Sequence, residues 1–146
     1  MHINIEIQED ITDTIVTITC KERNALVERL IAAIQMIDKQ IMVMHEGNIT
    51  ALNLEEILYI ESVDRKCFLY TAEKVYESFN KLYELEQQLA QYFFVRINKS
   101  CVVNLKNINS IKTYINRRLL ITLSNEEQLI VSRQYADEIK VLLGVK

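Results

Sequence analysis

Two kinds of hydrophobic period follow one another near the N-terminus. Residues 3–7 alternate Ile with polar side chains and residues 14–20 form a β-branched run, and both patterns are typical of β-strands. From residue 21 to about residue 39 the apolar side chains recur every three or four positions, which predicts one amphipathic helix. Its stripe consists of Leu26, Val27, Leu30, Ile31, Ile34 and Ile37. Such a stripe covers a sheet or forms an interface with a partner, and the pattern leaves both open.

Beyond residue 40 the period is mostly two, and polar turns divide the chain into short strands. In the segment His45–Asn48, Gly47 can take a positive φ, which is a hairpin signal. Asn116 and Arg117 form the turn between the predicted strands 108–115 and 119–123. The predicted strands cover residues 41–44, 49–54, 57–61, 67–71, 74–79, 93–97, 101–105, 108–115, 119–123 and 128–131.

Two further helices are predicted among these strands. Residues 81–91 have apolar side chains on one face and Asn80 as a candidate N-cap, and a terminal helix begins near Ser132. The expected fold class is therefore mainly β with flanking helices (α+β), preceded by a small N-terminal β-β-α extension.

Composition limits the class of protein. The chain has 146 residues, of which 49% are apolar, and this suffices for one compact domain with a small appendage. Its only glycines are Gly47 and Gly144 and it has no proline, so it has neither a glycine-rich phosphate loop nor a flexible linker. The N-terminus lacks the pattern of a signal peptide and no apolar run is long enough to span a membrane, so we expect a cytoplasmic protein without direct membrane insertion.

Residues suited to catalysis are scarce. His2 and His45 are the only histidines, and the carboxylate pairs at 55–56 and 126–127 lie in turn-like polar segments where solvation explains them. The cysteines at positions 20, 67 and 101 are far apart, which favours buried, reduced thiols over disulfides. We therefore expect a protein that is not an enzyme and that has no cofactor and no metal site.

Charge is distributed unevenly along the chain. Residues 1–54 and 55–90 each contain eight acidic and four basic side chains, whereas residues 91–146 contain nine Lys or Arg against four Asp or Glu. A basic segment is where a polyanion binds, although a solvated basic face has the same composition.

Two segments of this basic region have the chemistry of nucleic-acid recognition. A strand that includes Arg96 leads into the polar turn 98–100, which presents short hydrogen-bonding side chains beside a cation. Further on, Ser132 connects a strand to a helix, so Arg133 projects from a helix N-terminus, where backbone N–H groups favour an anion. Arg can also contact a guanine edge through two hydrogen bonds. An ordinary surface arginine beside a helix cap is the alternative reading.

Four motifs follow one another in the second part of the chain: ILYIES (57–62), LYELEQQL (82–89), FVRINKSCVVNLKNI (94–108) and LIVSRQY (129–135). On these motifs, residues 41–143 resemble the LytTR-type DNA-binding domain of bacterial transcription regulators. The family usually has His-Arg or His-Asn where this chain has Asn98-Lys99, and an aromatic residue in place of Cys101.

The resemblance implies a LytTR-like elongated antiparallel β-sheet domain, residues 41–146, whose loops enter successive major grooves of double-stranded promoter DNA. The base contacts that it implies are Asn98, Lys99, Arg133 and the segment 65–67. In that segment Cys67 is too short and apolar to bond a base, so either Arg65 or Lys66 makes the contact or the loop contacts phosphate only. The phosphate contacts that we expect are Ser100, Lys112, Arg117 and Arg118. The implied function is a sequence-specific DNA-binding bacterial transcription regulator. The alternative is a protein-interaction or small-ligand-binding module on the same β scaffold.

Residues 1–40 form the extension. The chain resembles the short members of the family that lack a receiver domain, and we expect no phosphorylation through such a domain. Three roles stay open for the extension: homodimerisation, contact with a membrane-protein regulator, and stabilisation of the domain. We favour a homodimer, because self-association would bury any exposed part of the apolar stripe.

Overall fold

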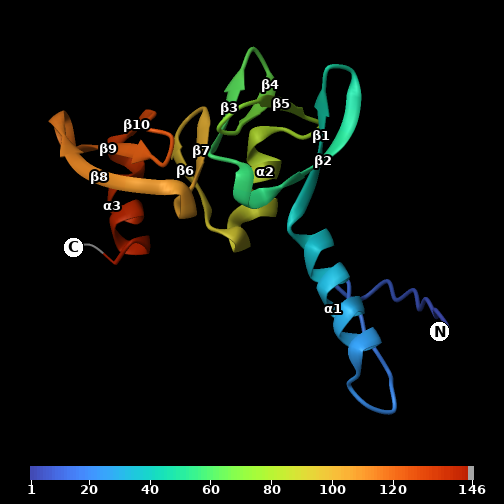
Figure 1. The fold of residues 1–146 in the computed structure, drawn as a ribbon. Coiled ribbons are helices and arrows are strands. Elements are labelled where there is room, and N and C mark those ends of the chain that lie inside the picture. Colours follow the sequence, from blue (N-terminus) through green and yellow to red (C-terminus); the bar gives the residue numbers. More distant parts are fainter. Residues whose placement is uncertain (145–146) are drawn as a thin grey trace. The chain divides into compact units, whose positions relative to one another are not determined.

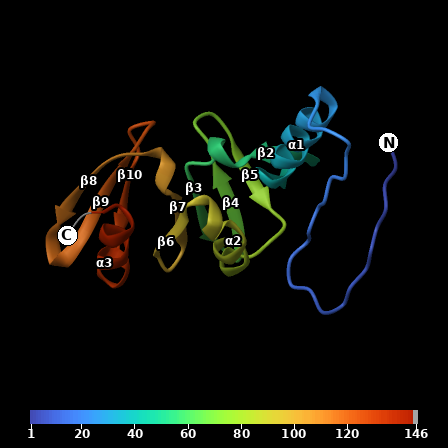
Figure 2. The same cartoon turned by 90° about the horizontal axis from the view of Figure 1, so that it is seen from below.

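The computed structural model describes residues 1–144, except for the side chains of Met36 and Asp38. The chain divides into two compact units, Met1–Ile37 and Asp38–Lys146. The strand pairings of the described chain all lie in the second unit, between residues 40 and 131 (Figures 1 and 2).

The N-terminal unit contains helix α1 (Ala25–Asp38) as its regular element. The Asn24 side chain accepts a hydrogen bond from the Val27 N–H at 3.1 Å, so the helix begins four residues later than the sequence predicted. The predicted strands at residues 3–7 and 14–20 are wrong: residues 1–24 contain no strand. An alternating pattern creates a β-strand only where another strand pairs with its backbone, and these residues have no such neighbour.

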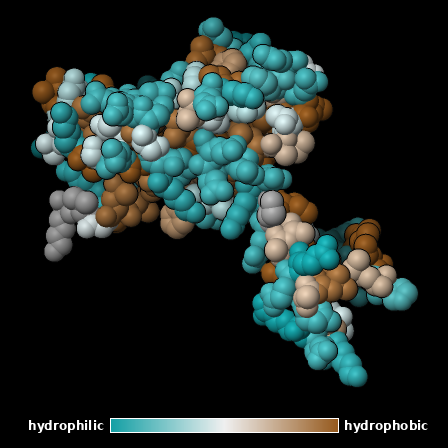
Figure 3. Space-filling model, in the orientation of Figure 1, coloured by the Kyte–Doolittle hydropathy of each residue, from teal (hydrophilic) through white to brown (hydrophobic). Residues whose placement is uncertain are grey.

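Apolar side chains remain exposed on the N-terminal unit, where Figure 3 shows brown and beige surface among the hydrophilic residues. In residues 1–24, the large apolar side chains that are exposed are Met1, Ile3, Ile5, Ile7, Ile11, Ile15 and Val16. Exposed apolar surface of this kind marks an interaction site in many proteins.

The second unit contains two antiparallel sheets, which confirms the predicted fold class. Seven strands have the order β2-β1-β5-β4-β3-β7-β6, and three have the order β10-β9-β8. The larger sheet consists of β1 (Gln40–His45), β2 (Asn48–Asn53), β3 (Tyr59–Val63), β4 (Lys66–Tyr70), β5 (Val75–Ser78), β6 (Phe94–Asn98) and β7 (Cys101–Asn104). The smaller sheet consists of β8 (Ile108–Tyr114), β9 (Arg118–Leu123) and β10 (Gln128–Val131).

Two helices of the second unit pack against these sheets (Figures 1 and 2). Helix α2 (Leu82–Leu89) begins one residue later than predicted, with Lys81 rather than Asn80 as its N-cap, because the Glu84 side chain accepts from the Lys81 N–H at 3.2 Å. Helix α3 (Arg133–Leu142) begins after Ser132, as predicted. Short 3₁₀ turns complete the described chain: η1 (Leu54–Glu56), η2 (Ala90–Tyr92), η3 (Leu105–Asn107) and η4 (Ile115–Arg117).

Two hydrophobic cores share the strands β3 and β7. The first core joins α2 to the larger sheet, and the second joins α3 to the smaller sheet. Along β7, Val102 faces the first core while Cys101 and Val103 face the second; along β3, Ile60 faces the first and Tyr59 the second. Because side chains alternate between the faces of a strand, these two strands form a wall with a core on each side.

Both predicted hairpin turns are present, and Gly47 has the predicted positive φ. Glu46 and Gly47 have φ of 50° and 80°, and Asn116 and Arg117 have φ of 58° and 62°. Positive φ at both residues gives the two-residue turn Glu46–Gly47 the twist that matches its strands. The second hairpin has a three-residue loop, residues 115–117, because Tyr114 pairs with Arg118.

Leu85 tests the first core, because it lies in the middle of α2 and is fully buried. We expect Leu85→Ala to lower the free energy of unfolding by about 2–5 kcal/mol, since truncation leaves a cavity beside the sheet. The exposed Gln87 on the same helix provides the control, because Gln87→Ala should change stability by less than about 0.5 kcal/mol. Urea denaturation measures both, and equal effects would contradict this description of α2.

The reactivity of the three cysteines tests which of them the structure buries. Cys20 is exposed, contrary to the sequence prediction, whereas Cys67 and Cys101 are buried. Burial raises the pKa of the Cys67 thiol and raises the pKa of Cys101 to about 12. Because the thiolate is the reactive form, we expect a thiol reagent at pH 8 to label one cysteine in the native protein and all three after denaturation. Rapid native labelling of a second cysteine would show that a core opens.

Candidate nucleic-acid interface

The β3–β4 turn and the β6–β7 turn lie at the same end of the larger sheet. Strand β3 pairs antiparallel with β7, with Glu61 opposite Cys101, so the last residues of β3 lie beside the first residues of β7. A backbone hydrogen bond of 2.8 Å from the Ser62 N–H to the Ser100 carbonyl joins the end of β3 to the β6–β7 turn. The structure therefore brings together two of the segments that the sequence predicted as base contacts.

The start of α3 lies beside the β6–β7 turn as well. The Ser132 N–H donates to the Ile97 carbonyl at 2.8 Å, and the Asn98 amide donates to the Ile130 carbonyl at 3.4 Å. These bonds link strand β6 to the segment that leads into α3. Around them the surface forms an open hollow of about 540 Å³, lined by Asn98, Lys99, Ser132, Arg133 and Gln134.

A β-bulge in β6 makes this junction possible. Arg96 pairs with Val102 and Asn98 with Cys101, so Ile97 is the extra residue on its strand. A bulge leaves its extra residue without a ladder partner, and the Ile97 carbonyl accepts from Ser132 instead. The β6–β7 turn therefore depends on the start of α3 as well as on β7.

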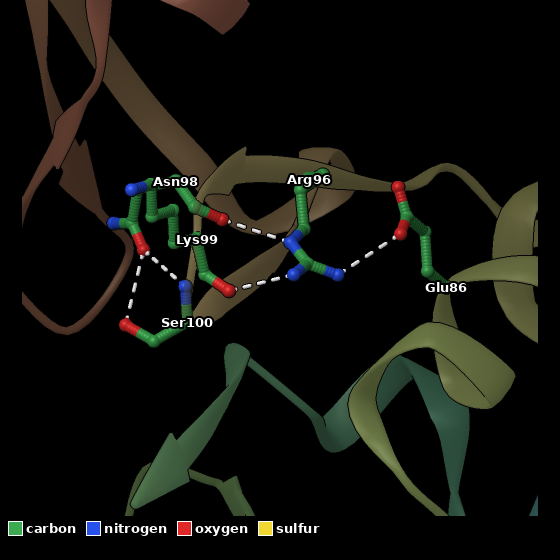
Figure 4. Close-up of polar contacts among 5 residues, drawn as sticks. All are labelled: Glu86, Arg96, Asn98, Lys99 and Ser100. Carbon is green, nitrogen blue, oxygen red and sulfur yellow. Dashed lines mark hydrogen bonds and ion pairs between the residues drawn. The ribbon is translucent and has the colours of Figure 1, made fainter.

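The Arg96 side chain forms hydrogen bonds with the backbone of the same turn (Figure 4). Its Nε donates to the Asn98 carbonyl at 2.8 Å and its Nη2 to the Lys99 carbonyl at 2.6 Å. On the opposite side, Nη1 donates to Glu86 Oε1 on α2 at 3.0 Å. One guanidinium thus connects two consecutive carbonyls of the turn to a helix.

The Asn98 side chain faces inward across the turn. Its Oδ1 accepts from the Ser100 N–H at 2.9 Å and from the Ser100 hydroxyl at 3.2 Å, while its Nδ2 donates to Ile130. The amide group has two N–H donors, so one remains for a ligand. Lys99, between Asn98 and Ser100 in the sequence, is exposed.

Arg65 and Lys66 occupy the tip of the β3–β4 hairpin. Arg65 is exposed with φ of 68°, in a turn that also places Asp64 at φ of 50°. The Lys66 ammonium lies 3.7 Å from Glu77 Oε1 on β5, and two thirds of its side chain is exposed. Exposed ion pairs of this kind are weak, so this lysine can exchange the carboxylate for another anion.

The other predicted phosphate contacts lie on the smaller sheet. Val131 at the end of β10 pairs with Leu119 near the start of β9, so the β8–β9 turn lies at the end of the sheet where α3 begins. Arg117 in this turn is exposed. Arg118 is half-buried, donates to the Ile115 carbonyl at 3.2 Å and lies over the Tyr114 ring at 5.2 Å.

Lys112 lies apart from the hollow at the β6–β7 turn. It is exposed on β8, at a small depression that Lys140 and Leu143 from the end of α3 also line. Of the predicted contacts, the structure thus brings Asn98, Lys99 and Arg133 into one hollow. Lys112 lines a different one.

The sequence did not predict the role of Arg96 or the contribution of Glu86. Their residue types indicate only a cation on a strand and an acid on a helix. The ion pair depends on the packing of α2 against β6 and on the bulge, neither of which has a local signal in the sequence.

The arrangement suits the binding of an extended anion. Cations lie at the turns, and the first residues of α3 line the hollow, where a helix N-terminus favours negative charge. Within residues 1–144, no three His, Cys, Asp or Glu side chains are grouped so that they could hold a metal ion. None of the helices that the structure describes has the length and apolar character needed to cross a membrane.

Comparison with known proteins identifies the family. The LytTr DNA-binding domain profile matches residues 47–144. The sensory transduction protein LytT of Bacillus cereus is 32% identical over 100 residues, which cover 68% of this chain and 41% of that protein. An uncharacterized HTH-type transcriptional regulator of Staphylococcus aureus is 26% identical over 147 residues, 99% of both chains.

The fold has a counterpart among solved structures. A LytTr DNA-binding domain from Bacillus cereus superimposes with a TM-score of 0.68, covering 73% of this chain and 97% of that domain at 24% sequence identity. The match agrees with the paired antiparallel sheets and the flanking helices described above. With the profile match over two thirds of its length, the chain belongs to the LytTR DNA-binding domain family.

Proposed function

We propose that this protein is a sequence-specific DNA-binding transcription regulator and that it reads base edges with its turns. The observation that carries the proposal is the junction of the β6–β7 turn with the start of α3, which gathers Lys99 and Arg133 around one open hollow. The family and the printed names of the relatives support the same function. Because bacterial DNA lies in the cytoplasm, the proposal places the protein there.

The proposed base contacts come from two places at one end of the larger sheet. Arg133 and Lys99 are exposed, and both line the hollow, so each can extend into a major groove about 12 Å wide. Asn98 offers its remaining amide hydrogen. At the β3–β4 turn, Arg65 and Lys66 are the corresponding contacts, and they reach a neighbouring stretch of the duplex in our proposal.

The proposed phosphate contacts lie around the residues that we propose contact bases. Ser100 lies in the β6–β7 turn, and Arg117 and Arg118 lie at the β8–β9 turn beside the start of α3. Lys112 is further away on β8, so its contribution is expected to be the smallest. Contacts to phosphate fix the position of a protein on DNA without reading its sequence.

The proposal separates Arg133 from Arg117 in a binding experiment. Arg133→Ala should reduce the preference for the target over scrambled DNA by roughly 5- to 150-fold, since a two-hydrogen-bond contact to a base contributes about 1–3 kcal/mol of discrimination. Arg117→Ala should weaken binding to both sequences equally and lower the slope of log K against log salt by about one. Titrations with a duplex selected from random DNA, at several salt concentrations, measure both effects.

Lys74→Ala is the matched control, because Lys74 is an exposed cation in the β4–β5 turn, at the opposite end of the strands from the β3–β4 turn. It should leave preference and salt slope unchanged. Equal losses on target and scrambled DNA for Arg133→Ala would show that Arg133 reads no base. If the wild-type protein selects no DNA at all, the protein-interaction or ligand-binding alternative is favoured.

We also propose a homodimer formed through residues 1–37, whose exposed apolar side chains support self-association. A chain that begins at Gln40 should be monomeric and bind one half-site with near-normal affinity. It should lose the added affinity that the full chain gains from two half-sites about one helical turn apart. Sedimentation with and without DNA provides the measurement. A full-length protein that stays monomeric on DNA would contradict the dimer, and a membrane-protein partner or stabilisation would remain as roles for this segment.

A further inference from the structure

We propose that Arg96 is a positioning residue for DNA recognition, held in place by Glu86, and that it contacts no phosphate itself. The inference rests on the proposed function. It differs from the usual expectation for an arginine beside a DNA-binding turn, which is direct neutralisation of a phosphate.

The geometry supports a brace within the protein. Three N–H groups of Arg96 are directed at three acceptors of this chain, and only 19% of the side chain is exposed. The planar guanidinium matches this arrangement because its donors diverge in fixed directions. Glu86 supplies the opposite charge at 3.0 Å, so little of the positive charge remains for a phosphate.

The bulge explains why the turn needs such a brace. After the bulge at Ile97, the pair Asn98–Cys101 alone continues the β6–β7 ladder, and Lys99 lies beyond it in the turn. Arg96 holds both carbonyls and so fixes the direction in which Lys99 leaves the turn. Glu86 connects the guanidinium to α2, which the first core holds through Leu82, Leu85 and Leu89. The recognition turn is therefore positioned relative to a rigid part of the domain.

A brace of this kind affects recognition more than stability. Partly exposed ion pairs add little to the free energy of folding, whereas a base contact depends on accurate placement of the side chain that makes it. Loss of the brace should thus reduce discrimination between sequences. It should leave the charge that DNA senses almost unchanged.

Two variants test the inference in the full-length protein. Arg96→Lys keeps the charge and removes the fixed fork, and we expect discrimination between target and scrambled duplex to fall about tenfold, part of what a complete base contact contributes. The slope of log K against log salt should stay the same, because no phosphate contact is lost. Glu86→Gln removes the ion pair and leaves the carbonyl contacts, so the loss of discrimination should be smaller and in the same direction.

Glu56→Gln is the charge-matched control for Glu86→Gln. Glu56 is an exposed acid that precedes β3, at the end of that strand opposite the β3–β4 turn, so its substitution changes the net charge equally without touching the turn. It should leave discrimination unchanged. Thermal unfolding of each variant shows whether the fold is retained, and Glu86→Gln alone suffices if Arg96→Lys does not fold.

The outcomes separate this inference from the proposed function. If Arg96→Lys and Glu86→Gln discriminate as well as the wild type, the brace has no role and the inference is overturned. A third variant, Arg96→Ala, tests direct contact with phosphate. If it weakens binding to all DNA equally and lowers the salt slope by about one, Arg96 is a phosphate contact and the inference is overturned. A wild-type protein that shows no sequence preference would instead contradict the proposed function itself.

Discussion

The shared wall of β3 and β7 is the constraint on which the candidate interface depends. Both strands bury side chains on both faces, so neither can shift by one residue without moving apolar side chains out of one core and into the other. The β3–β4 turn and the β6–β7 turn extend from this wall, and their mutual position follows from its register. The second core packs α3 against the other face of this wall. The first residue of α3, Arg133, therefore lines the same hollow as Lys99.

The strand topology brings together basic side chains that lie far apart in the sequence. By position in the sequence, Arg65 and Lys66 belong to an acidic region, but the antiparallel pairing places their turn beside the basic β6–β7 turn. The opposite end of the same strands carries acidic side chains, including Glu55, Glu56 and Glu73 around one depression. The second unit thus has the proposed DNA-binding cations at one end of these strands and three glutamates, with Lys74 beside them, at the other.

Local patterns predicted most of the second unit and failed in the first. Strand β10 has the predicted bounds Gln128–Val131, and a turn lies at Asn116–Arg117 as predicted, because alternation and turn chemistry are properties of neighbouring residues. The alternating isoleucines at 3–7 formed no strand, because pairing requires a partner that periodicity does not reveal.

For the candidate site, the turn 98–100 and the start of α3 were each predicted separately. Their junction through Ser132 and Ile97, and the brace from Glu86, depend on contacts between distant segments.

Amide chemical-shift mapping during titration with a selected target duplex tests whether the two turns and the start of α3 bind DNA together. We expect the largest changes at Arg65, Lys99 and Arg133 together, with little change at residues 55–56 and 71–74. Changes concentrated at the acidic end, or absent from both turns, would contradict this expectation.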